Sequence, residues 1–427
     1  MQAGYSEIDI TPPIRTELGG YGYYLGRRMR GVLDPLYARC VVIKLGDGKL
    51  RAIDNRPYIV IVSCDIVQLG MSVINKVRHA LKKDGYAADQ VMLVATHSHT
   101  APITGAIEGC GAEDEAYAAV LPDLIIRAIR AAEADIADVT SVYTTRARAM
   151  NVAYNRTSPD GPVDDYVRGV LMERAGRPPI ALINFACHPV TLGRLDMASA
   201  DYPGRVAARM KKRGTNAIFL NGPCGDIDPV SNRDAWGSGT EATIERYAEH
   251  ITDAFEAGLT PAEFSDWTVR TTRFDVNLRN EPVDIEYIQS EVKKAVDESG
   301  EDAPQMRARR AWAAALESAL LKGVDLSAEV FTAPVVSIGP VVLIGLPFEV
   351  YTKTGQMIRA TLPDNLVLVM GCAEQTRGYL PTIDEYERGA YGARESMFLY
   401  LRAPIAQGEA EAIAVALGER IASWLKI

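Results

Sequence analysis

The stretch from Val91 to Pro102 constrains the fold of this chain more than any other part of its sequence. It begins with an unbroken apolar run with β-branched residues at Val91 and Val94, which is typical of a buried strand. Pro102 has no backbone N–H to donate, so a regular ladder must end before it. His97 and His99 follow the apolar run. Because alternate residues of an extended chain project to the same side, both imidazoles are expected to face one pocket. Such a pair fits either a metal site or two hydrogen-bonded polar residues.

Three later strands are expected to end in the same way. Each apolar run leads to side chains that can bind a metal: 180–186 to His188, 217–220 to Asp226 and Asp228, and the hairpin 335–346 to Glu349. Sites in α/β proteins gather where strands end, so these side chains are expected to converge with His97. Two imidazoles and a carboxylate are a common ligand set for a catalytic zinc with an open position. The alternatives are a hydrogen-bonded core histidine for His188 and a helix N-terminal carboxylate for Glu349.

The order of the expected elements predicts an α/β fold. Strands at 36–44 and 58–62 are followed by an amphipathic helix around 73–81 and then by the strand that begins at Val91. We therefore expect mixed β-sheets flanked by helices, with the active site at strand ends. A single domain is expected to span residues 1–427.

Two further segments are interpreted from their composition and periodicity. Residues 1–35 are rich in glycine, tyrosine and arginine and are interpreted as a folded loop over a pocket. Residues 283–322 are interpreted as a helical insertion made of helices at 283–298 and 304–322. Other helices are expected at 116–137, 239–257 and 409–425.

The charge balance argues against several classes of partner. The chain has 46 basic and 55 acidic side chains, and a net charge of −9 disfavours binding to nucleic acid or to an anionic membrane. We expect a small-molecule substrate and no nucleic-acid or membrane partner, and a homo-oligomer stays open. The six cysteines form no C-x-x-C pair and are expected to be reduced thiols. The N-terminus lacks the features of an export signal, so we expect a cytoplasmic protein.

Taken together, the motifs resemble those of the neutral/alkaline ceramidases, a family of zinc amidases. The resemblance runs in family order across nearly the whole chain. It is carried by 4–12, which corresponds to the family's opening strand, Asp34-Pro35-Leu36-Tyr37-Ala38-Arg39, Thr96-His97-Ser98-His99-Thr100-Ala101-Pro102, Asn155-Arg156, Phe185-Ala186-Cys187-His188-Pro189, Ser199-Ala200-Asp201, Gly225-Asp226-Ile227-Asp228-Pro229, Pro347-Phe348-Glu349, and 378–391.

This resemblance implies the ceramidase catalytic-domain fold and a set of site residues. One zinc ion would be coordinated by His97, His188, Glu349 and Tyr379. His99 would contact the substrate or the attacking group, and Arg156 would fix or polarise the substrate. Tyr391 would stabilise the developing oxyanion by hydrogen bonding. The ion would lower the pKa of a bound water towards ~7 and polarise the scissile carbonyl, which implies amide or ester hydrolysis.

The sequence departs from the family in the G-D-x-S-P loop, where Asp228 replaces the serine. We hypothesise that Asp228 is a general base or an orienting group for the zinc-bound water. It is alternatively a ligand that draws in a second metal beside Asp226, or a loop carboxylate that caps backbone amides. The family also has a histidine where this chain has Leu33.

Ceramidases also carry a C-terminal β-sandwich and a secretion signal, and neither is recognised in this sequence. We therefore predict that the substrate is a small soluble amide rather than membrane ceramide. The N-terminal loop is predicted to form a lid that recognises a polar or anionic group through Tyr21, Tyr23, Tyr24, Arg27, Arg28 and Arg30.

Two other functions stay open. One is lactone or ester hydrolysis at the same zinc site. The other, from a different class, is a non-catalytic metal-binding protein that has lost the family serine. The presence of His97, His99, His188, Glu349 and Tyr379 together favours an enzyme.

Overall fold

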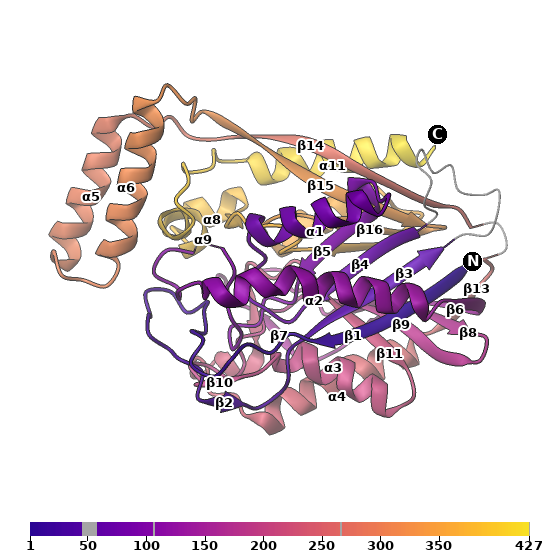
Figure 1. The fold of residues 1–427 in the computed structure, drawn as a ribbon. Coiled ribbons are helices and arrows are strands. Elements are labelled where there is room, and N and C mark those ends of the chain that lie inside the picture. Colours follow the sequence, from indigo (N-terminus) through magenta and orange to yellow (C-terminus); the bar gives the residue numbers. More distant parts are fainter. Residues whose placement is uncertain (45–57, 106, 265–266, 427) are drawn as a thin grey trace.

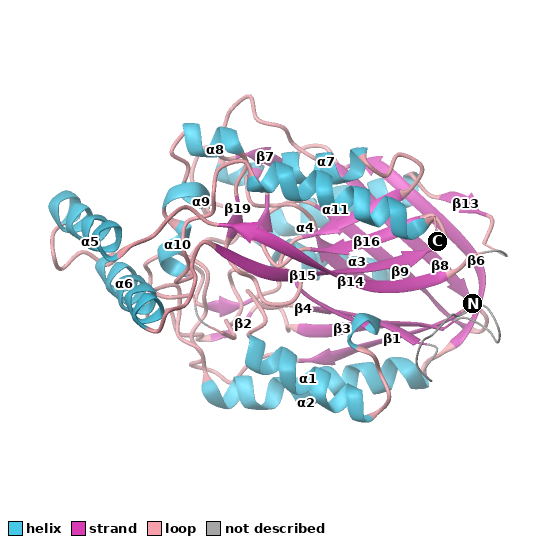
Figure 2. Ribbon diagram, turned by 90° about the horizontal axis from the view of Figure 1, so that it is seen from above, coloured by secondary structure: helices cyan, strands magenta, loops and turns pink. Residues whose placement is uncertain are grey.

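The computed structural model describes residues 1–44, 58–105, 107–264 and 267–426. Two β-sheets lie face to face, and helices cover both outer faces (Figures 1 and 2). This arrangement confirms the predicted α/β fold of mixed sheets flanked by helices. Among the described helices, none is both long and apolar enough to cross a membrane.

The larger sheet is mixed and has nine strands. They are β1 (Gln2–Asp9), β3 (Tyr37–Lys44), β4 (Tyr58–Cys64), β5 (Val91–Ala95), β6 (Ala137–Arg148), β8 (Tyr166–Arg174), β9 (Arg177–Phe185), β11 (Asn216–Asn221) and β13 (Thr260–Ala262). Their order is β11-β9-β8-β6-β1-β3-β4-β5, with β13 paired to β6. The pairs β4/β5 and β9/β11 are parallel, and the other neighbours are antiparallel.

The smaller sheet has four strands in the order β14-β15-β16-β18. Their bounds are β14 (Val269–Arg279), β15 (Ala328–Ile338), β16 (Val341–Gly345) and β18 (Leu366–Met370). Alternation along β16 explains how this sheet is buried on both faces. Val341 and Leu343 pack against the larger sheet, whereas Val342 and Ile344 pack against helices on the other side.

Helices cover the two sheets in three groups. On the larger sheet lie α1 (Met71–Lys83) and α2 (Glu115–Ala134), and farther along it α3 (Asp201–Lys212) and α4 (Glu241–Ala257). The smaller sheet is covered by α7 (Thr352–Ala360) and α11 (Glu409–Leu425). Figure 1 shows α5 (Ile285–Ser299) and α6 (Met306–Leu321), which lie within the predicted helical segment 283–322, projecting together from the body.

Short elements connect these layers near the strand ends. They are β2 (Gly31–Val32), η1 (Ala88–Gln90), β7 (Ala153–Asn155), β10 (Met197–Ala198), β12 (Ile227–Pro229), η2 (Val230–Asn232), β17 (Glu349–Val350), β19 (Tyr379–Leu380), α8 (Ile383–Glu387), α9 (Tyr391–Arg394) and α10 (Ser396–Leu399).

The larger sheet brings its two ends together, because β11 packs against β3, β4 and β5. The Ser63 hydroxyl on β4 donates to the carbonyl oxygen of Phe219 on β11 over 2.7 Å. At the strand ends, Asn221 Nδ2 donates to the carbonyl oxygen of Thr96 over 3.1 Å. The loops that follow β5 and β11 therefore meet, although these strands stand at opposite ends of the hydrogen-bonded order.

The prediction that residues 1–35 form a loop is wrong for the first part of that segment. Residues Gln2–Asp9 form β1, paired with β3 along its whole length, as the resemblance to the ceramidases implied. The remainder is a loop tied to the rest of the fold by backbone hydrogen bonds, such as Gly20 N–H to the carbonyl oxygen of Cys110 over 2.8 Å. All six cysteines are buried and unpaired with one another, as expected for reduced thiols.

Candidate metal centre

His97 follows β5 in a strained backbone conformation. Its φ of +69° lies in the left-handed region, which non-glycine residues rarely adopt and which is often found at functional sites. The Nδ1 atom lies 2.8 Å from the carbonyl oxygen of Val67, so it must be the protonated nitrogen. The Nε2 atom, which then carries the lone pair, faces Glu349 Oε2 at 3.4 Å.

His188 follows β9 and repeats this arrangement. Its Nδ1 contacts the carbonyl oxygen of Cys224, and its Nε2 lies 2.9 Å from the same Oε2 atom of Glu349. The lone pairs of both Nε2 atoms and the Glu349 carboxylate oxygen thus point at one another. This arrangement is stable when a proton or a metal cation lies among them. The imidazole tautomers therefore fit a metal site, with both Nε2 atoms available as ligands.

His99 completes the cluster. Its ring centroid lies 4.7 Å from that of His97 and 5.6 Å from that of His188. One ligand atom from each histidine lies within 4.8 Å of the others, and this is the one group of three or more such residues among those the structure describes. Both ring nitrogens of His99 are buried without a hydrogen-bond partner in the described chain. A buried imidazole in this state needs a polar partner, which a water, a substrate or an ion can supply, because an unsatisfied polar group is costly.

The electrostatics of the cluster follow from burial and mutual contact. Burial raises the pKa of Glu349, but His97 and His188 outweigh it and hold that pKa well below the usual value. Burial lowers the pKa of His97, but Cys372 and Glu349 raise it well above the usual value. Burial, helped by the other two histidines, lowers the pKa of His99, so this imidazole is neutral.

A two-residue ladder places Tyr379 beside Glu349. The strands β17 and β19 pair in parallel with Glu349 opposite Tyr379. The other carboxylate oxygen, Oε1, accepts a hydrogen bond of 2.8 Å from the hydroxyl of Tyr400. Burial and then the Glu349 charge raise the pKa of Tyr379 well above the usual value. Its phenol is therefore neutral unless a cation binds it.

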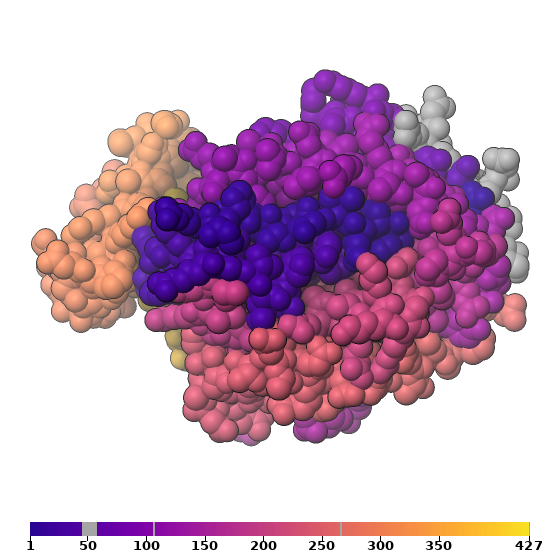
Figure 3. All heavy atoms as spheres, turned by 60° about the horizontal axis from the view of Figure 1, so that its bottom comes forward, coloured from indigo at the N-terminus to yellow at the C-terminus, as the bar shows by residue number. Residues whose placement is uncertain are grey.

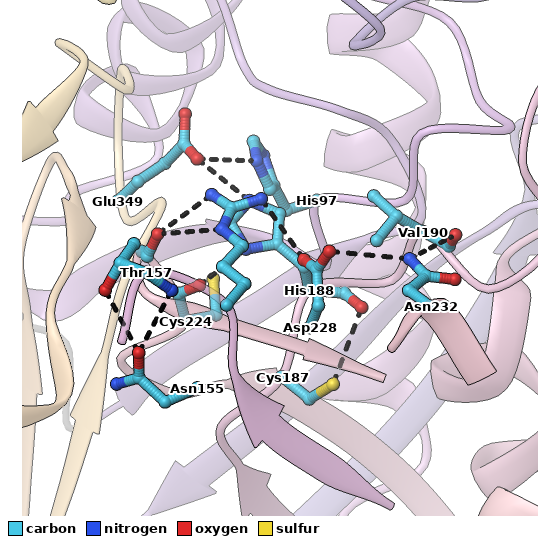
Figure 4. A network of polar contacts seen from close by, with 12 residues as sticks. His97, Asn155, Thr157, Cys187, His188, Val190, Cys224, Asp228, Asn232 and Glu349 are labelled. Carbon is cyan, nitrogen blue, oxygen red and sulfur yellow. Dashed lines mark hydrogen bonds and ion pairs between the residues drawn. The ribbon is translucent and has the colours of Figure 1, made fainter. Parts of the chain in front are cut away.

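A second short ladder places Arg156 and Asp228 next to the cluster. Figure 4 shows Asp228 beside His188. The strands β7 and β12 pair antiparallel, and Arg156 directly follows β7. Its Nη1 donates to Asp228 Oδ1 over 3.1 Å, and its Nη2 donates to the Tyr379 hydroxyl over 2.9 Å. Asp228 Oδ2 also lies 3.4 Å from Asn232 Nδ2. Asp228 therefore acts on this arginine rather than standing free.

Asp226 has a different environment. Its Oδ1 accepts hydrogen bonds from the backbone N–H and the hydroxyl of Thr352, and its Oδ2 accepts one from Asn155. Burial raises its pKa to about 6. All of these contacts are internal to the protein scaffold. The carboxylates of Asp226 and Asp228 belong to no cluster of three or more metal-ligating side chains within the described residues.

Tyr391 begins α9 and stands at the outer side of the site. Its ring lies 5.7 Å from that of Tyr379, and 43% of the residue is exposed. It is therefore far more exposed than His97 and His99, which are 1% and 8% exposed. All eight residues singled out in the sequence thus form one connected set of contacts.

Sequence reasoning missed two residues that contact this set. Tyr400 hydrogen-bonds Glu349, but it lies in a short apolar segment without a motif. Gly20 has a φ of +101°, and a Cβ there would lie 2.6 Å from the Cγ atom of His99. The glycine-rich composition of the N-terminal segment signalled a close approach, but not which residue it approaches.

The fold and the site define a layered α/β protein with a candidate metal site at its strand ends. Its fold is that of neutral ceramidase, as predicted. The crystal structure of neutral ceramidase from Pseudomonas aeruginosa matches with a TM-score of 0.70 and 17% sequence identity, over 98% of this chain and 74% of that one. A ceramidase complexed with C2 matches with a TM-score of 0.71 and 18% identity, over 98% of this chain and 75% of that one. No protein-family model and no curated protein sequence matches this chain.

Proposed function

We propose that this protein is a metal-dependent hydrolase that cleaves the C–N bond of a small amide. The observation that supports it most is the buried cluster of His97, His99 and His188, in which Nε2 of His97 and both ring nitrogens of His99 have no hydrogen-bond partner in the described chain. The cluster lies at the strand ends of a neutral ceramidase fold. Clusters of imidazole and carboxylate side chains at strand ends are typical of catalytic zinc sites.

Zinc is the metal we propose, held by His97, His188, Glu349 and Tyr379. When bound there, it supplies Lewis acidity and a water of lowered pKa. The nitrogen donors fit this ion, because Nδ1 of both His97 and His188 is committed to a backbone carbonyl and leaves Nε2 free. His99 is the alternative third nitrogen ligand, since it lies equally within reach of the cluster.

In the proposed reaction the other residues position the amide and move its protons. The neutral His99 imidazole accepts a proton from the attacking water and returns it to the leaving nitrogen. Arg156 and Tyr391, both partly exposed, hydrogen-bond the carbonyl oxygen as negative charge develops on it. The water oxygen forms a bond to the carbonyl carbon, the C–N bond breaks, and the products are a carboxylic acid and an amine.

Asp228 acts in this scheme as a positioning residue. Its ion pair with Arg156 fixes the guanidinium that also donates to the Tyr379 hydroxyl. A carboxylate can hold a cation in this way, whereas the serine of the ceramidases cannot. In this scheme Asp228 orients Arg156, whereas the hypotheses from the sequence made it a general base, an orienting group for the zinc-bound water or a ligand of a second metal.

The function is tested by metal analysis followed by substrate assays on matched variants. Purified protein should contain close to one equivalent of zinc. After subtraction of the uncatalysed rates, it should hydrolyse short N-acyl amides faster than the corresponding esters or lactones. His97→Ala should lose both metal and activity. His79→Ala, which removes an exposed histidine on α1, is the control and should keep both. Protein that takes up no metal would refute the proposal, and turnover of lactones alone would move the function to the ester class.

A further inference from the structure

The N-terminal loop places a buried tyrosine directly against the candidate metal centre. The ring of Tyr21 lies 5.2 Å from the ring of His99, edge to face, and Tyr21 is 7% exposed. Its hydroxyl is buried and has no hydrogen-bond partner in the described chain. The Arg27 guanidinium stacks over the same ring at 4.6 Å and donates to the carbonyl oxygens of Gly19 and His99. The loop is thereby fixed to the site rather than lying loosely over it.

Tyr21 also contacts a second group of side chains that faces solvent. The ring of Trp236 lies 4.8 Å from that of Tyr21 and nearly perpendicular to it, and Trp236 is 48% exposed. Arg194 stacks over the ring of Tyr24 at 4.7 Å and lies 5.9 Å from the ring of Trp236. We refer to Tyr21, Tyr24, Arg194 and Trp236 as the aromatic rim. Figure 3 shows the surface where the N-terminal segment, in indigo, borders the pink segment that follows residue 190.

The arginine of the aromatic rim has unused hydrogen-bonding capacity. Arg194 makes no hydrogen bond and no ion pair with another residue in the described parts of the chain. Two aromatic rings hold its guanidinium, and this stacking leaves the in-plane N–H donors free. A guanidinium held in this way presents two parallel N–H donors, which match the two oxygens of a carboxylate.

The charge around the rim also favours an anion. The guanidinium of Arg27 donates its hydrogen bonds to carbonyl oxygens, and the carboxylate that acts on it electrostatically is that of Asp196. The nearby Asp196 carboxylate is 3.6 Å from Arg30, and Asp228 is paired with Arg156. Of the two arginines that act on Tyr21, Arg27 has its donors bonded to carbonyl oxygens, so Arg194 is the one with donors left for an anion.

We propose that the aromatic rim is a substrate-binding subsite for a carboxylate attached to a flat apolar group. The flat group would stack on the exposed ring of Trp236, which Tyr21 supports from below the surface, and the carboxylate would bind Arg194. The inference rests on the proposed function, because it makes the substrate an amide with an anionic aromatic portion, such as an N-acyl aromatic amino acid. A purely structural stack of Arg194 on its two rings would instead give no preference between acids and their neutral counterparts.

Binding is measured by isothermal titration calorimetry with two probes that differ in charge, phenylacetate and phenylacetamide. The wild-type protein should bind phenylacetate at least about tenfold more tightly. Arg194→Gln should remove this ratio, and Trp236→Leu should weaken both probes. Arg233→Gln is the matched control, because it removes the same charge from a guanidinium stacked on a different ring, that of Tyr154, at 5.2 Å. It should keep the ratio.

Hydrolysis of N-acetylphenylalanine and N-acetylphenethylamine, which differ only in the carboxylate, gives the second readout. The subsite predicts a higher kcat/KM for the acid and a loss of that preference in Arg194→Gln, mainly through KM. Equal kcat/KM for the two amides, or an unchanged ratio in Arg194→Gln, would overturn the subsite and leave the proposed function intact. Preferential phenylacetate binding lost in Arg194→Gln, without hydrolysis of any amide, would support the subsite while refuting the proposed function.

Discussion

The carboxylate of Glu349 lies 2.9 Å from Nε2 of His188, although the two residues are 161 positions apart in the sequence. The same oxygen atom, Oε2, faces Nε2 of His97 at 3.4 Å. Each histidine has its other nitrogen bonded to a backbone carbonyl, so neither imidazole can turn its N–H towards the carboxylate without losing that bond. The scaffold thus holds three lone-pair donors around one point, which is the arrangement that a divalent cation stabilises.

Replacement of Glu349 by glutamine is expected to weaken metal binding while it keeps the size of the side chain. The amide carries no charge, so zinc affinity should fall by at least about tenfold, and amide hydrolysis should fall with it. The measurement is competition with a chromophoric chelator. Glu395→Gln removes a partly exposed carboxylate from its ion pair with the buried Arg309 and serves as the control. Equal zinc affinity in Glu349→Gln and wild type would exclude Glu349 from the ligand set.

Replacement of Asp228 by asparagine is expected to separate metal binding from turnover. The variant loses the 3.1 Å ion pair with Arg156 but keeps an oxygen that can accept from Asn232. Zinc content should stay near one equivalent, and kcat should fall by about 10²-fold or more, because the guanidinium loses its fixed position. Zinc analysis and steady-state kinetics are run on the same preparation. Loss of metal together with activity would instead support Asp228 as a ligand, and unchanged turnover would remove it from the mechanism.

The pH dependence of stability is expected to report on Asp226. Burial raises the pKa of this carboxyl to about 6 in the folded protein, against 3.8 for an unperturbed group. The folded state therefore binds this proton more tightly, so the contribution to stability is complete below about pH 4 and is lost as pH rises to about 6. A shift of about two units corresponds to about 3 kcal/mol. Asp226→Asn cannot ionise, so its stability relative to wild type should increase over this window.

Urea unfolding of wild type and Asp226→Asn at several values from pH 4 to 7 measures that difference. Asp165→Asn, which removes a partly buried carboxylate paired with the exposed Arg148, is the control and should show no comparable trend. A constant difference across the range would mean that the donors from Thr352 and Asn155 keep Asp226 ionised throughout.

The strand ends of the site could be predicted from sequence because they follow long periodic or apolar runs. The apolar runs that form β5, β9, β11 and β16 are each followed by a residue of the site. The contacts between β5 and β11 bear out the expectation that these strand ends converge. The hairpin expected to turn at Gly339-Pro340 is the connection between β15 and β16. Burial on both faces makes such runs easy to recognise.

The remaining organisation depends on elements too short to carry a periodic signal. The ladders β7/β12 and β17/β19 set Arg156 beside Asp228 and Glu349 beside Tyr379, but they contain two or three residues in each strand. The long strand β14 was not predicted, because most of its residues are only partly buried and alternate weakly. Helix α3 was also missed, since Pro203 and Gly204 in its first turn disfavour a helix by propensity. Tertiary contacts decide these elements.

Gly20 offers the sharpest test of the contact between the N-terminal loop and His99. An alanine Cβ at this position would lie 2.6 Å from Cγ and 2.7 Å from Nδ1 of His99, and the φ of +101° already disfavours any side chain. Either the imidazole or the loop must move, so kcat/KM should fall by about 10²-fold. Gly22→Ala is the matched control for this substitution, because its φ of +55° is also positive but no atom lies within 4 Å of the added Cβ.

Both variants should lose about 1 kcal/mol or more of stability through backbone strain, measured by urea unfolding, but Gly22→Ala should keep its turnover. If Gly20→Ala kept wild-type kcat/KM, the position of the His99 ring would not matter for catalysis, and the role proposed for that imidazole would be lost.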